Sequence, residues 1–93
     1  PAVLDVVDLA THYHSMELKI EELSVGAGGF GAGETLRSSG LRDQLGLIVI
    51  AIKRANGDML FNPDAEARIE PGDRLVVMGQ AASLRDLEQR LSA

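Results

Sequence analysis

The chain has 93 residues and a net charge of −5, a size that fits one domain. It contains no cysteine, which excludes disulfides and thiolate chemistry, and its 3% aromatic content argues against base-stacking platforms for single-stranded nucleic acid. Lysine and arginine are scattered along the chain, so we expect no nucleic-acid partner. No apolar stretch approaches the roughly 20 residues of a membrane span, so we expect no direct membrane insertion.

Residues 1–15 are predicted to be a linker that forms the end of a preceding helix. Pro1 suits a first helical turn. His12 and His14 are interpreted as part of an exposed polar connector. The alternative is a metal site, because on a strand the two histidines would share one face. Because the chain begins without Met, we expect it to be a fragment of a longer parent protein.

Residues 17–25 alternate between apolar and polar side chains, which predicts a strand with one solvent-facing side. Lys19 and Glu21 are expected to face solvent. The apolar side chains, interrupted by a break at Glu22, are expected to face the core: Leu18, Ile20, Leu23 and Val25.

Residues 26–31 match the pattern G-x-G-x-x-G and follow a strand, as a dinucleotide-binding fingerprint does. That fingerprint also needs a full helix and a continuing βαβ series. Ser39-Gly40 interrupts the helix early, and Asn56-Gly57 predicts a hairpin. We therefore interpret the segment as a flexible loop between a strand and a short helix. A nucleotide-binding enzyme remains an alternative hypothesis.

Residues 35–39 predict one or two turns of helix that end at Gly40, and residues 41–46 predict a second short turn. Three leucines of this region are expected to point inward: Leu36, Leu41 and Leu45.

Residues 47–52 are an almost unbroken apolar run rich in β-branched side chains, which predicts a buried strand at the centre of the fold. Asn56-Gly57 then predicts a tight hairpin turn, in which both residues have positive φ. Residues 59–61 are the returning strand, and residues 65–69 are expected to be short and extended.

Pro71-Gly72 suits the central positions of a type II turn, and residues 75–79 predict another buried strand. Ser83 is expected to cap the final helix, with Asp86 completing a weakened capping box. The apolar face of this helix is predicted from spacings of three and seven residues: Leu84, Leu87 and Leu91.

The sequence shows no catalytic constellation, so we predict a binding or regulatory module and not an enzyme. Nucleophilic catalysis needs an activated nucleophile beside a base, and the only histidines lie in the first 15 residues. Glu21 and Glu22 are expected on opposite faces of a strand. Oxygen ligands for a divalent cation could come from four carboxylates, although solvated surface positions are favoured: Glu17, Glu21, Asp64 and Glu66.

Several motifs occur together in a characteristic order: Gly33-Glu34-Thr35-Leu36, Leu41-Arg42, the run 47–54, Pro63, and the segment 71–79. In this order and spacing, the chain resembles the RCK C-terminal (TrkA-C) domain over about residues 16 to 92. The resemblance implies an α+β fold for residues 16–93, with a small, mainly antiparallel sheet, short helices and a C-terminal helix.

The resemblance also implies a function. Domains of this family are ligand-sensing regulatory lobes that dimerise and control potassium transport. We therefore expect a homodimer that works with an N-terminal RCK lobe and the membrane pore of a parent channel, at the cytoplasmic face of the cell membrane. The alternative is a ligand-free dimerisation or scaffold lobe of a cation transporter or antiporter.

Some family members bind cyclic di-AMP between two such lobes, and the resemblance assigns the ligand-binding role to Leu41, Arg42 and Ile48. Two symmetry-related arginines suit a two-fold dianion, and apolar side chains suit purine faces. No cofactor is certain; cyclic di-AMP and a divalent cation are the candidates. The competing interpretation of Arg42 is a surface residue paired with Asp43 or another carboxylate.

Overall fold

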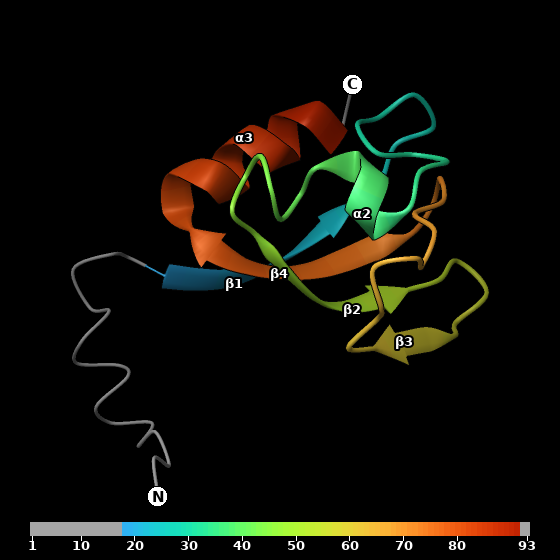
Figure 1. Ribbon diagram of the computed structural model, residues 1–93. Helices are drawn as coiled ribbons and strands as arrows, with labels where there is room; N and C mark the ends of the chain where they lie inside the picture. The colour runs from blue at the N-terminus through green and yellow to red at the C-terminus, as the bar shows by residue number, and fades with distance from the viewer. Residues whose placement is uncertain (1–17, 92–93) are drawn as a thin grey trace, which may run out of the picture.

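The computed structural model describes residues 18–91 and has one four-stranded antiparallel sheet in the order β1-β4-β2-β3. The strands are β1 (Leu18–Ser24), β2 (Ile48–Lys53), β3 (Met59–Phe61) and β4 (Arg74–Gln80). Helices α2 (Leu36–Ser39) and α3 (Ala81–Leu91) lie on the same side of the sheet (Figure 1). The predicted α+β class with a C-terminal helix is confirmed. The predicted N-terminal linker, His12 and His14 lie outside the described residues.

The core lies between the sheet and α3. Along β4, Leu75 and Val77 are fully buried and alternate with half-buried residues, so the predicted buried strand is fully buried on one face only. Leu75 and Val77 face the apolar side of α3, whose three leucines are also buried, and the predicted helix face is therefore confirmed: Leu84, Leu87 and Leu91. Gly79 belongs to the same sheet face, and a Cβ there would lie 2.2 Å from Leu47 Cδ2. A glycine at this position lets the Leu47 side chain fill the core.

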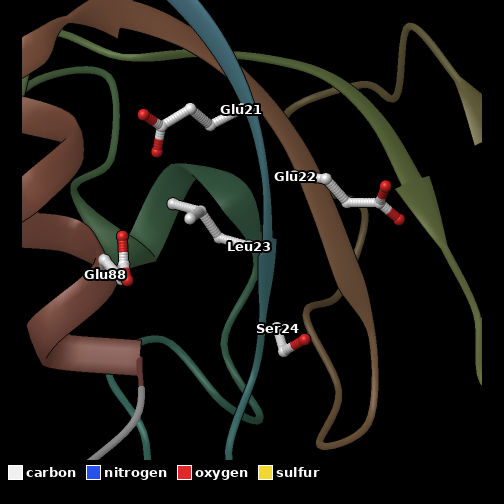
Figure 2. Close-up of a pocket in the computed structure, with 5 residues that line it drawn as sticks. All are labelled: Glu21, Glu22, Leu23, Ser24 and Glu88. Atoms are coloured by element: carbon white, nitrogen blue, oxygen red, sulfur yellow. The ribbon is translucent and has the colours of Figure 1, made fainter.

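Strand β1 differs from the prediction, because its apolar residues are divided between two faces. Pairing with β4 runs without interruption from Leu18 opposite Gln80 to Ser24 opposite Arg74, so no break occurs at Glu22. Leu23 therefore faces α3, whereas Ile20 lies on the opposite face and is 61% exposed. Figure 2 shows this division directly, with Leu23 and Glu22 on different sides of the strand.

Strand β2 contains a bulge at Ile50. The register with β4 pairs Val49 with Val77 and Ile52 with Leu75, and it shifts between them. Strict alternation would put Val49 and Ile52 on opposite faces. Because of the extra residue, both side chains face α3 and contribute to the core.

The two predicted turns have different outcomes. The hairpin between β2 and β3 exists, but its loop covers residues 54–58, and within it only Gly57 has a positive φ, of 97°. The Asn56 side chain instead accepts a hydrogen bond from the Asp58 N–H at 2.9 Å. The prediction of a two-residue turn was therefore wrong. The type II turn is confirmed, because Gly72 has φ 89° and the Asp73 N–H donates to the Glu70 carbonyl at 3.0 Å.

The helix boundaries were predicted in part. Helix α2 begins after Thr35, whose side chain forms a reciprocal capping box with Ser38, and it ends at Gly40 with φ 80°. Helix α3 begins at Ala81 and not after Ser83. Alanine has the highest helix propensity and Ala81 is buried, so the helix follows β4 directly.

Residues 65–69 do not form a free extended segment. A turn occupies residues 65–66, and the backbone of residues 65–69 pairs with that of residues 33–37. The Leu36 N–H donates to the Ala67 carbonyl and the Arg37 N–H to the Ala65 carbonyl, both at 2.9 Å. This pairing holds the start of α2 beside the segment that follows β3.

Candidate functional site

A groove of about 580 Å³ lies between the 36–49 segment and the loop that follows β3. Its volume is in the range of small-molecule sites. Its charged lining comes from Arg37, Arg42 and Asp43, and Asn62 adds an amide. The rest of the lining is apolar: Leu36, Leu47, Ile48, Val49, Pro63 and Ala65.

Backbone hydrogen bonds fix the loop that carries Arg42. The Gln44 N–H donates to the Gly40 carbonyl at 2.8 Å, and the Gly46 N–H donates to the Arg42 carbonyl at 3.0 Å. Leu41 anchors the loop in the core with a side chain that is 2% exposed. The Arg42 side chain therefore projects from a loop whose backbone is already held in place.

Arg42 is exposed, and within residues 18–91 its guanidinium takes part in no ion pair or hydrogen bond. The alternative of a surface pair with Asp43 or another carboxylate is therefore not seen in the part of the chain that the structure describes. Arg37, at the same groove, pairs with Glu66 at 2.8 Å, with both side chains about two-thirds exposed. A cation without a protein partner beside apolar side chains can bind an anion that also carries an apolar surface.

The structure brings together two of the three residues assigned to the site. Arg42 and Ile48 line the groove, and Ile48 is 53% exposed. Leu41 lies beneath it in the core. Sequence reasoning did not assign Arg37 and Asn62. Nothing in the spacing indicates that residues 33–37 pair with residues 65–69, or that the Asn62 N–H donates to the Ile50 carbonyl.

The glycine-rich loop at residues 26–31 has little capacity to bind phosphate. The Gly26 N–H donates to the Leu91 carbonyl and the Phe30 N–H to the Arg90 carbonyl, each at 2.9 Å. These carbonyls end α3, so the loop satisfies the helix C-terminus. A Cβ at Gly29 would lie 2.2 Å from the Leu91 carbonyl oxygen. The glycine there is required by this close approach of two backbone segments.

Three carboxylates line a hollow beside β1, but they do not all lie on the same side of the strand. Figure 2 shows Glu21 on the side of α3, near Glu88, and Glu22 on the opposite side of the strand. Glu22 pairs there with Lys53 at 3.1 Å. Among residues 18–91, no three histidine or carboxylate side chains are grouped as a metal site requires.

The same part of the chain contains no helix that is long and apolar enough to cross a membrane.

The sheet face opposite α3, which we call the outer face, carries exposed apolar side chains. Ile20, Met78 and Ile48 lie directly opposite one another on three adjacent strands, and we call them the apolar row. Phe61, on the same face, is 76% exposed. Because Ile48 also lines the groove, the groove and the apolar row form one continuous surface.

Known proteins resemble this chain in sequence and fold. The family model of the TrkA-C domain matches residues 20–92. The K(+)/H(+) antiporter subunit KhtT of Bacillus subtilis (strain 168) is 33% identical over 87 residues, which cover 94% of this chain and 50% of KhtT. The chain thus spans half the length of that curated relative.

Two solved structures have closely similar folds. The RCK C domain of the potassium transport protein KtrA, in complex with cyclic di-AMP, is 28% identical with a TM-score of 0.70, over 90% of this chain and 93% of that one. The RCK_C domain dimer of S. agalactiae BusR with cyclic di-AMP has a TM-score of 0.71 at 20% identity, over 81% of this chain and 91% of that one. Because the family model covers most of the described fold, this chain belongs to the TrkA-C domain family, whose members are regulatory domains.

Proposed function

We propose that this chain is a ligand-sensing lobe that regulates potassium transport and binds cyclic di-AMP in the groove, between two copies of the chain. The observation that carries the proposal is the unpaired Arg42 guanidinium beside the exposed Ile48. A cyclic dinucleotide supplies two phosphates and two purines related by a two-fold axis, which matches one Arg42 and one Ile48 from each copy. The KtrA complex supports this ligand.

The second copy would cover the apolar row. Exposed apolar side chains on adjacent strands are typical of a surface that another protein covers. The row meets the groove at Ile48, so one two-fold contact would bury the row and complete the ligand site. The BusR domain, which shares the fold, is described as a dimer.

Binding at this contact would favour one orientation of the two copies, and the N-terminal RCK lobe of the parent would transmit that preference to the membrane protein at the cytoplasmic face. Such a switch requires that the ligand bind the two orientations with different affinities.

A divalent cation is the weaker candidate effector, because residues 18–91 offer no grouped ligands. The expected absence of a nucleic-acid partner stays a prediction, since BusR, at 17% identity, was also solved with promoter DNA.

The parent protein has two candidates. The sequence resemblance predicts a channel. The 33% identity to the antiporter subunit KhtT favours a potassium/proton antiporter, and we adopt this as the second candidate. The ligand-free scaffold remains the rival for the lobe itself; it accounts for the apolar row but assigns no role to the unpaired Arg42.

Thermal unfolding of the 93-residue chain with cyclic di-AMP, NAD, Ca²⁺ or Mg²⁺ tests the proposal. At a hundredfold excess over Kd, a specific ligand adds about 2.7 kcal/mol of stability. We expect this shift with cyclic di-AMP, its loss in Arg42→Ala, and its retention in Arg85→Ala, which removes an exposed arginine on α3. No shift with any ligand, together with an intact dimer, would favour the scaffold.

A further inference from the structure

Asn62 has an unusual backbone conformation. Its φ is 51°, and among residues 18–91 it is the only residue other than glycine with a positive φ. The next residue is Pro63, and a proline pushes the residue before it towards extended conformations. Glycine would adopt the positive φ at a lower cost. Backbone conformations of this kind persist where the surroundings hold them, and they cluster at ligand-binding sites.

The backbone of Asn62 is hydrogen-bonded to the bulge in β2. The Asn62 N–H donates to the Ile50 carbonyl at 2.7 Å, and Ile50 is the residue at which the pairing with β4 shifts. A bulge of this kind often re-aims chain segments next to a functional site. The groove side of β2 and the loop after β3 are therefore locked together through one backbone contact.

The side chain of Asn62 lines the groove together with Arg42 and Ile48. It is exposed, and among residues 18–91 its amide forms no hydrogen bond with another group. A carboxamide presents a donor and an acceptor side by side. The adenine edge presents the matching pair, with the N6 amino group as donor and N7 as acceptor, whereas guanine presents two acceptors, O6 and N7.

We propose that Asn62 selects adenine in the groove, through hydrogen bonds to the N6 amino group and N7 of the base. This inference rests on the proposed function, in which each of two copies contacts one base of a cyclic dinucleotide. Arg42 would then bind the phosphates, which adenine and guanine ligands share, and Asn62 would distinguish the bases. Because Asn62 has a positive φ, its side-chain amide takes a different direction from that of an extended residue before proline.

The test compares the affinities of the 93-residue chain and of Asn62→Gly for cyclic di-AMP and cyclic di-GMP, measured by titration calorimetry. Glycine keeps the positive φ, so the fold is retained while the amide is removed. We expect the affinity for cyclic di-AMP to fall on the order of a hundredfold, about tenfold for each adenine, and that for cyclic di-GMP to change little. Asn56→Gly makes the same change in the distant hairpin loop and should leave both affinities unaltered.

Asn62→Asp keeps the size of the side chain and its tolerance of positive φ but cannot donate to N7, so it should also lose preference for adenine. An unchanged ratio of the two affinities in Asn62→Gly and Asn62→Asp would overturn the role of Asn62 while leaving the proposed function intact. If the unmodified chain bound neither dinucleotide, the proposed function itself would fail, and the role of Asn62 with it.

Discussion

The glycine-rich loop at residues 26–31 and the groove are both built from loops, but they use their polar groups differently. In the glycine-rich loop, the N–H groups of Gly26 and Phe30 donate to the last carbonyls of α3. In the groove, the side chains of Arg42 and Asn62 contact no polar partner within residues 18–91. The hydrogen bonds that a loop already makes, and not its glycine spacing, therefore indicate where a ligand can bind.

The largest expected effect is on the stability of the fold, at the glycine-rich loop. Gly29→Ala should lower the free energy of unfolding by about 3 kcal/mol, because the new Cβ would meet the Leu91 carbonyl oxygen and separate the loop from α3. Urea denaturation measures the loss. Gly57→Ala is the matched control: its φ is 97° but a Cβ there meets nothing within 4 Å, so only about 1 kcal/mol should be lost. Equal losses in the two variants would contradict the account.

A second structural contact lies at the opposite end of the sheet from the groove. Asp73 is 2% exposed, and its carboxylate accepts hydrogen bonds from the Arg54 guanidinium and from the Glu70 N–H. Arg54→Ala leaves this buried carboxylate without its cation, so stability should fall by about 2 kcal/mol in urea denaturation. The additional stability given by cyclic di-AMP should be unchanged, since Arg54 is remote from the groove lining. Loss of the stabilisation by cyclic di-AMP in Arg54→Ala would show that the Arg54–Asp73 contact and the groove are not independent.

The outer face is expected to carry the contact between the two copies. Ile20→Glu should weaken the dimer at least tenfold, because it puts a charge into the apolar row, while the monomer fold tolerates it at an exposed site. Sedimentation measures the dissociation constant. Ser24→Glu lies on the same face of the same strand, outside the apolar row, and is the matched control. Equal dimer affinities for the two variants would exclude the apolar row from the contact.

The smallest effect concerns the exposed side of α3. Arg90 Nε lies 3.0 Å from Asp86 Oδ1, and both side chains are 44% exposed. Asp86→Ala should therefore cost only a few tenths of a kcal/mol in urea denaturation. A loss above about 1 kcal/mol would show that this surface has a structural role like that of the glycine-rich loop.

Much of the fold could be predicted from local patterns. The apolar run at 47–52, the Pro71-Gly72 turn and the leucine spacing of α3 each depend on neighbouring residues, and the structure confirms the strand, the turn and the helix face. The strand is not buried throughout, because Ile48 is 53% exposed. The division of β1 could not be predicted, because Leu18 and Ile20 look like core residues until the pairing with β4 is known. Apolar side chains that a partner covers follow the same alternation as those that the core covers.

The site could be predicted less completely than the fold. The family resemblance assigned Arg42 and Ile48, which line one groove, together with Leu41, which supports the loop from the core. The contribution of Asn62 depends on the bulge at Ile50 and on a positive φ before proline. Both features arise from tertiary contacts between β2, β3 and β4, so no local pattern indicates them.

The stoichiometry of binding shows whether two copies of the groove bind one cyclic di-AMP. Titration calorimetry of the 93-residue chain, with its oligomeric state followed by light scattering, gives the number of ligands per chain. The account predicts one cyclic di-AMP for every two chains, bound to a dimer, and loss of binding in Arg42→Ala. One ligand for each chain, or a dimer that binds none, would contradict it.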